Sequence, residues 1–165
     1  MAHMTRWLDA EEQQAWRAFL AAVRLLFDTL DRELQRDAGM PHAYYEILVR
    51  LSEAEGRRLR MSQLADAAGS SRSSLSHAAT RLEERGWIRR ESAPGDRRGQ
   101  IAVLTDEGFR VLAAAAPGHV EGVRTHLLDP LSPAQRRQLA EISTTLLTHL
   151  CRVSERPGRQ RGEGG

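Results

Sequence analysis

The chain has 165 residues, of which 41% are hydrophobic and 5% aromatic, and a formal net charge of +2. This length suits one domain, or one domain with added helices. A single cysteine, Cys151, excludes an internal disulfide and a metal site built from several thiolates. No apolar stretch approaches the roughly 18–20 residues that cross a membrane, and no signal-peptide pattern opens the chain, so we expect a cytoplasmic protein.

The charge is unevenly distributed along the chain. All 24 basic residues are arginine. This bias fits a genomic base composition, so arginine content alone does not indicate nucleic-acid binding. Residues 57–100 hold ten arginines and five acidic residues, whereas residues 1–56 hold six and ten. A positive segment in an almost neutral chain is typical of a local surface that binds a polyanion.

The first half of the chain predicts two helices. Asp9 and Glu12 have the spacing of a capping box, and Gly39 marks a helix end. A helix of about 30 residues, or about 45 Å, is longer than a small domain needs for itself. Pro41 predicts a second helix that closes near Gly56. The apolar positions of the first helix are Trp16, Phe19, Leu20, Val23, Leu26, Phe27, Leu30 and Leu34.

A compact central region follows. "MSQLADAAG" predicts a third helix capped by Ser62, and "SSRSSLSHAATRLEERG" predicts a fourth that ends at Gly86. "WIRRES" and "QIAVLT" predict two strands that pair around "APGDRRG". The inward residues of the fourth helix are Leu75, Ala79 and Leu82.

Two further helices complete the chain. Thr105 predicts the start of a helix that runs to about Leu128 and bends at Pro117. Ser132, followed by Pro133 and Gln135, predicts the start of the last helix. Residues 1–6 and 154–165 are expected to be disordered or left from an expression vector. The apolar stripe of the last helix is Leu139, Ile142, Leu146, Leu147 and Leu150.

A short helix, a tight turn, a helix and a two-stranded ribbon, in this order, predict a winged helix-turn-helix in a mostly α-helical fold. The fourth helix would enter the major groove of DNA, because residues 70–74 are four serines and one arginine, and His77 lies one turn further on. The hairpin, with Arg97 and Arg98 at its tip, would reach the DNA backbone or the minor groove, where arginine is favoured.

These segments resemble the MarR family of bacterial transcription regulators, especially its members from high-GC actinobacteria. The resemblance runs from about Trp7 to Val153. It is carried by "RMSQLADAAG", "SSLSHAATRLEERGWIRRE" and "DRRGQIAVLTDEG". The residues that match the family's wing pattern are Asp96, Arg98, Leu104, Thr105 and Gly108.

The resemblance implies a single unit over residues 7–153, with interlocking dimerisation helices at residues 7–39 and 106–153 and a winged-helix DNA-binding lobe at residues 41–105. It implies a homodimeric repressor of a near-palindromic operator in double-stranded DNA, with half-sites about 34–36 Å apart. Arg98 would enter the minor groove, and Asp96 would hold the wing arginines. The implied DNA-binding residues are Arg72, Ser73, Ser74, His77, Asp96, Arg97 and Arg98.

The resemblance also implies that a small aromatic or phenolic ligand releases the DNA. Its pocket would be lined by Trp16, Phe19, His42, Tyr45 and Phe109, although aromatic residues at helical spacing also occur as ordinary core.

Other ways of sensing are less favoured by the sequence. His119 and His126 are seven residues apart and have no obvious third ligand, so we predict no metal site and no cofactor. Cys151 lies in an apolar stripe, which predicts a core residue rather than a redox sensor.

The sequence holds no catalytic motif that would indicate an enzyme: no nucleophile elbow, no phosphate loop and no paired zinc histidines. The alternative to a DNA-binding regulator is a winged-helix module that binds another protein without specific DNA recognition. The positive segment at residues 57–100 favours DNA.

Overall fold

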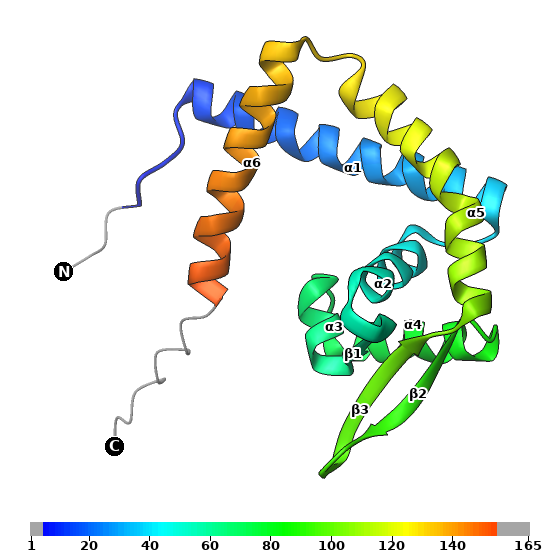
Figure 1. Cartoon of the computed structure of the whole chain (residues 1–165). Coiled ribbons are helices and arrows are strands. Elements are labelled where there is room, and N and C mark those ends of the chain that lie inside the picture. The colour runs from blue at the N-terminus through cyan, green and yellow to red at the C-terminus, as the bar shows by residue number, and fades with distance from the viewer. Residues whose placement is uncertain (1–4, 155–165) are drawn as a thin grey trace, which may run out of the picture. The chain divides into compact units, whose positions relative to one another are not determined.

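The computed structural model describes residues 5–154, except the side chains of Arg97, Arg98 and Ser154. The terminal segments that the sequence predicts to be disordered therefore lie almost entirely outside the described residues. The chain forms two compact units, one ending at Val123 and one beginning at Arg124. The first unit contains α1 (Ala10–Ala38), α2 (His42–Glu53), η1 (Glu55–Arg57), β1 (Arg58–Arg60), α3 (Met61–Ala67), α4 (Arg72–Glu84), β2 (Ile88–Ala93), β3 (Asp96–Leu104) and α5 (Asp106–Val123) (Figure 1).

Helix α1 begins and ends where its sequence predicts. The Glu12 amide donates to Asp9 Oδ1 over 2.8 Å, and the Asp9 amide donates to Glu12 Oε2 over 3.0 Å, which completes the capping box. Gly39 ends the helix with a φ of 63°. Within the helix only Leu30 and Leu34 are buried. Its apolar N-terminal half is therefore exposed in the single chain.

The core of the first unit lies between the helices and the inner face of the sheet. Helix α5 approaches α1 closely at Gly122, where a Cβ atom would lie 2.6 Å from Glu33 Oε2 and 3.1 Å from Leu30 Cδ2. The fully buried large side chains are Met40, Leu48, Leu51, Leu64, Leu75, Leu82 and Ile88. They come from the α1–α2 connection, α2, α3, α4 and β2, so this core holds the helix-turn-helix against the wing.

The start of α3 differs from the prediction. The helix begins at Met61, so Ser62 lies in its first turn and does not cap it. The chain passes from β1 directly into α3, and Arg60, the last strand residue, occupies the N-cap position. The Arg60 amide donates to Gln63 Oε1 over 3.2 Å, which satisfies this end of the helix without a serine cap.

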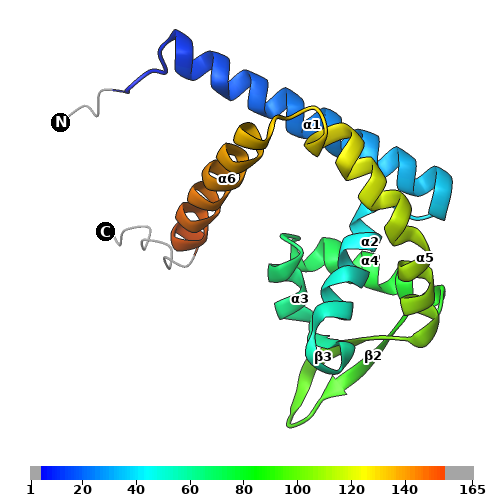
Figure 2. The same ribbon diagram turned by 45° about the horizontal axis from the view of Figure 1, so that its top comes forward.

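The sheet has three antiparallel strands in the order β1-β3-β2, and β1 was not predicted. The hairpin is also tighter than predicted: Ala93 pairs with Asp96 around Pro94-Gly95, and Gly95 has a φ of 75°. The backbone of Arg97 and Arg98 therefore belongs to the first residues of β3, directly after the turn, and not to the loop that the sequence predicted. A register shift between Ser92 and Ala93 accommodates the extra residues of β3 as a bulge. In both views the hairpin extends away from the neighbouring helices (Figures 1 and 2).

Helix α5 begins as predicted, since Thr105 Oγ1 accepts from the Gly108 amide over 3.0 Å. A Cβ atom on Gly108 would overlap the Trp87 carbonyl oxygen, so only glycine permits this close approach to the end of the helix-turn-helix. The helix continues through Pro117, and the departure from α-helical geometry comes later, in the π-helical turn η2 (Arg124–Leu128).

The second unit consists of η2 and α6 (Pro133–Ser154). The predicted cap is present, because the Ser132 amide donates to Gln135 Oε1 over 2.9 Å and the Gln135 amide donates to Ser132 Oγ over 3.3 Å. Cys151 is exposed, so its prediction as a core residue was wrong for the single chain. The exposed apolar side chains of α6 are Ile142, Leu146, Leu147, Leu150 and Val153.

Candidate nucleic-acid interface

Helix α4 separates an apolar face from a polar one. Leu75, Ala79 and Leu82 are buried, as predicted, and anchor the helix in the core. Ser71 precedes the helix as its N-cap, and its Oγ accepts from the Ser74 amide over 3.1 Å. The four residues predicted to contact DNA from this helix are all exposed: Arg72, Ser73, Ser74 and His77. One helix end thus presents short polar side chains, an arginine and a histidine to solvent.

A left-handed glycine makes the turn that positions α4. Gly69 has a φ of 59° and follows α3, whose Leu64 and Ala65 are buried in the same core as α4. The Ser70 amide donates to the Ala65 carbonyl oxygen over 2.9 Å, which closes the end of α3. This compact connection fixes the direction in which α4 leaves the turn.

At the end of the hairpin, Asp96 is held by its neighbours. Its Oδ2 lies 3.4 Å from Arg60 Nη1 of β1. It also occupies the space beside Gly99, where a Cβ atom would lie 2.5 Å from Asp96 Oδ2. The side chains of Arg97 and Arg98 lie outside the described part of the structure, so their predicted contacts stay predictions. The strand that carries these arginines begins at Asp96, whose carboxylate is paired with Arg60.

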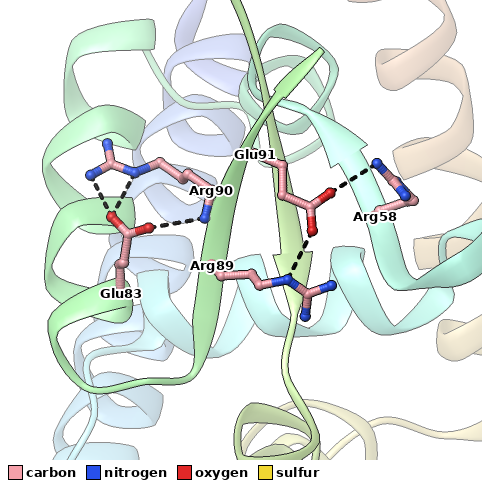
Figure 3. A network of polar contacts seen from close by, with 5 residues as sticks. All are labelled: Arg58, Glu83, Arg89, Arg90 and Glu91. Carbon is pink, nitrogen blue, oxygen red and sulfur yellow. Dashed lines mark hydrogen bonds and ion pairs between the residues drawn. The ribbon is translucent and has the colours of Figure 1, made fainter. Parts of the chain in front are cut away.

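Ion pairs attach the wing to the rest of the lobe on both faces of the sheet (Figure 3). On the inner face, Glu83 of α4 accepts from the Arg90 amide over 2.9 Å and from Arg90 Nη2 over 2.6 Å. The hydrogen bonds from the Arg90 side chain lower the pKa of Glu83. On the other face, Glu91 contacts Arg58 and Arg89 over 3.1 and 2.9 Å. None of these five residues was singled out as functional, because the Glu83–Arg90 and Arg58–Glu91 pairs each join two separate elements.

A small pocket of about 150 Å³ lies between α2 and α5. It is lined by His42, Tyr45, Glu46, Val49 and His119. The His119 ring lies 4.4 Å from the Tyr45 ring and 5.4 Å from the His42 ring, measured between centroids. Nδ1 of His119 is buried without a hydrogen-bond partner. Burial, and secondarily the His42 charge, lower the pKa of His119, and burial raises the pKa of Tyr45.

The structure does not bring all five predicted ligand-binding residues together. His42 and Tyr45 share the pocket with His119, which the sequence analysis had weighed only as a metal ligand and had not placed in the ligand pocket. Phe109 lies elsewhere on α5, where the Arg57 guanidinium stacks 3.9 Å from its ring centroid. Trp16 and Phe19, in the N-terminal half of α1, are about half exposed and do not line the pocket.

Metal binding has no support in the described geometry. Within residues 5–154, no three histidine, cysteine, aspartate or glutamate side chains cluster in a way that could hold a metal ion. His119 packs against aromatic rings. The helices of the same region also include none that is long and apolar enough to span a bilayer.

Comparison with known proteins decides the family. A family model described as "MarR family" matches residues 38–99, which covers the helix-turn-helix and most of the hairpin. The structure of Sco3205, a MarR family transcriptional regulator from Streptomyces coelicolor in complex with DNA, is similar with a TM-score of 0.85 and 55% sequence identity. That match covers 88% of this chain and 91% of Sco3205. The chain belongs to the MarR family.

Two further relatives agree with this membership. AbsC, a MarR family regulator from Streptomyces coelicolor, has a TM-score of 0.82 and 46% identity, over 88% of this chain and 98% of AbsC. The transcriptional repressor MprA of Escherichia coli is 31% identical over 117 residues, which are 71% of this chain and 66% of MprA. The chain is therefore a MarR-family transcriptional regulator, and its fold is the winged helix that the sequence predicted.

Proposed function

We propose that this regulator is a homodimeric repressor that binds a near-palindromic operator, with α4 in the major groove and the β2–β3 hairpin in the minor groove. The observation that carries the proposal is the two-faced α4. Its Leu75, Ala79 and Leu82 are buried, whereas the residues at its start are polar and exposed. The similarity to Sco3205, which was solved with DNA, supports this use of the lobe.

Within the proposal, the two DNA-contacting elements have different tasks. Ser73, Ser74 and His77 would read base edges, and the free amides at the start of α4 would favour a phosphate. Arg97 and Arg98 would supply charge and minor-groove contact, aided by Arg72 on the phosphates. Affinity would then depend strongly on salt, while sequence preference would reside in α4.

The exposed apolar side chains of α1 and α6 support a homodimer. Trp16 and Phe19 of α1 are about half exposed, and Leu147 of α6 is 64% exposed. Several large apolar side chains exposed on one helix mark a protein interface, and a symmetric pair of lobes fits a near-palindromic site. We propose that a second copy of the chain covers both helices.

The pocket between α2 and α5 supports regulation by a small ligand. His119 Nδ1 is buried without a hydrogen-bond partner, its ring lies beside the Tyr45 ring, and Glu46 lines the same pocket. A small aromatic molecule that carries a hydroxyl or carboxyl group would satisfy this atom and fill the remaining apolar surface. Because the pocket joins α2 of the DNA-binding lobe to α5, an occupant could favour one arrangement of these helices.

The test is an anisotropy titration of a labelled duplex from the gene's own upstream region, beside a scrambled duplex, at several salt concentrations. Preferential binding to the native duplex, with log affinity falling linearly in log salt, is the expected result. Equal weak binding to both duplexes would mean that the operator does not lie in this upstream region. The absence of binding at low salt would contradict the proposal and favour the alternative, a winged-helix module that binds a protein.

A further inference from the structure

The two faces of the wing sheet are built differently. Partners in register place their side chains on the same face of a sheet, and neighbours along a strand alternate between faces. Ala102 and Leu104 of β3 therefore point inward, where they join the main core. Ile101 and Val103 point outward, yet they are 9% and 6% exposed. Together with Ala93 they form a separate small apolar cluster, which we call the wing cluster.

Long charged side chains flank the wing cluster on both neighbouring strands. Val103 is paired with Arg58 of β1 on one side and with Arg89 of β2 on the other. Ile101 is paired in the same way with Arg60 and Glu91. The aliphatic stems of such side chains bury apolar surface while their charged groups stay in water. The inner face of the sheet is covered by helices, whereas the outer face is covered by charged side chains.

Glu91 connects this layer across the whole sheet. One of its carboxylate oxygens contacts Arg58 Nη2 over 3.1 Å, and the other contacts Arg89 Nε over 2.9 Å (Figure 3). The single carboxylate therefore ties β1 to β2 over β3. Nearer the tip, Arg60 and Asp96 form a further pair between β1 and β3. These contacts hold the outer side of the strands that carry the predicted minor-groove residues.

We propose that Glu91 is a positioning residue that determines specificity: by bridging Arg58 and Arg89 over the wing cluster, it orders the wing before DNA arrives. An ordered wing loses less conformational entropy on binding, and only a correctly placed operator benefits from that order. Non-specific binding relies on charge and gains little from it. This inference rests on the proposed function, because it requires operator binding.

Loss of the Glu91 bridge and loss of the Glu91 charge should change DNA affinity in opposite directions. Removing the carboxylate takes one negative charge away from a surface near the wing, which by itself strengthens binding to any DNA. Losing the bridge instead weakens operator binding, because the wing must be ordered during binding. The Glu91→Gln variant separates the two effects, since glutamine keeps the size of the side chain and removes the ion pairs.

The experiment uses the duplex that the native protein enriches from a random-sequence library, beside a scrambled duplex of equal length. Glu91→Gln should lower affinity for the enriched duplex by about three- to tenfold, the size expected for two exposed ion pairs lost together. Affinity for the scrambled duplex should stay the same or rise. Hydrogen exchange at the Ile101 and Val103 amides should become faster, while the melting temperature stays close to that of the native protein.

Two further variants sharpen the result. Glu107→Gln is the matched control, because it removes one carboxylate that pairs with one arginine, Arg110, inside helix α5. It should leave the ratio of the two affinities unchanged. Glu91→Asp keeps the charge but is one methylene shorter, so it should lose the two-sided bridge and lower the ratio in the same direction as Glu91→Gln.

Four results would overturn the inference. If Glu91→Gln left the ratio of affinities for the enriched and scrambled duplexes unchanged, Glu91 would have no role in specificity. A fall in melting temperature with equal losses for both duplexes would make its role merely structural. Native behaviour of Glu91→Asp would show that charge acts without the bridge. If the native protein itself enriched no duplex, the proposed function would fail as well, so the two failures are distinguishable.

Discussion

The DNA-binding lobe and the long helices α1 and α6 differ in how they bury apolar side chains. In the lobe, Leu48, Leu51 and Leu75 are buried within one chain, at 0–1% exposure. In α1 and α6, side chains of the same kind remain exposed, including Phe19 at 50% and Leu147 at 64%. The lobe therefore buries its apolar side chains within one chain, in a core that also includes Leu34 of α1 and Leu112 of α5, whereas much of the apolar surface of α1 and α6 stays exposed. Stability and assembly should respond to different substitutions.

The largest expected effect comes from a matched pair of leucine truncations. Leu48→Ala removes a fully buried side chain and should lower the free energy of unfolding by about 2–5 kcal/mol. Leu147→Ala removes the same atoms from an exposed position and should change the stability of the isolated chain far less. Urea unfolding at protein concentrations low enough to separate the subunits measures both. Equal losses would mean that α6 belongs to the folding core of the single chain.

A charge on α6 tests the proposed dimer directly. Leu147→Asp would bury an unpaired carboxylate in the interface, and breaking an interface in this way costs several kcal/mol, so we expect a monomer. Sedimentation equilibrium measures the mass of the assembly, and Arg137→Gln on the same helix is the control, because it shifts the net charge by the same single unit. A dimer that survives Leu147→Asp would place the interface elsewhere.

Substitution of Arg98 in the wing should have the next largest effect. It should change DNA binding by the lobe and not dimer formation. Arg98→Ala should weaken operator binding by more than about tenfold and leave the proposed dimer intact, because it removes the proposed minor-groove contact. Arg110→Ala on α5 is the matched loss of one positive charge. Anisotropy that shows the same affinity for the Arg98 variant and the native protein would remove Arg98 from the interface.

Changes on the exposed face of α4 should alter preference more than affinity. Ser74→Ala or His77→Ala should lower the ratio of operator to random-DNA affinity, with a loss of about 1–3 kcal/mol for a base contact. Ser76→Ala is the control, because Ser76 is also exposed on α4 but is not among the predicted DNA contacts. If both variants keep the native ratio, the proposed orientation of α4 in the groove is wrong.

The smallest effect concerns pH and the pocket between α2 and α5. Because burial lowers the pKa of His119 in the folded protein, the unfolded chain takes up its proton first as the pH falls. Stability should therefore decline as the pH falls below about 6.5, the ordinary histidine value. His119→Gln should remove part of this decline. Thermal unfolding at a series of pH values checks it, and an identical pH profile for the variant would contradict the burial of His119.

The features predicted correctly from sequence are those with local causes. The capping box at Asp9 and Glu12, the turn at Gly39 and the buried face of α4 all depend on residues within a few positions of one another. The same holds for the cap at Ser132. Local chemistry determines such elements because the chain can satisfy it before any distant contact forms.

The errors and omissions come from contacts between distant segments. Strand β1 has three residues and exists because it pairs with β3 some forty positions away, which no local pattern reveals. It also displaces the start of α3 and makes Ser62 an ordinary first-turn residue. The ion pair between Glu91 and Arg58 and the contact of His119 with Tyr45 arise in the same way, through elements that pack together only in the fold.

In the proposed complex, two α4 helices of a dimer occupy two major-groove half-sites. Chemical footprinting of the enriched duplex tests it most directly, with a reagent that reports guanine N7 in the major groove and a second reagent that reports the minor groove. We expect two protected major-groove segments about 34–36 Å apart, or a multiple of that spacing, each flanked by minor-groove protection. Protection of a single major-groove segment, or of the minor groove alone, would contradict it.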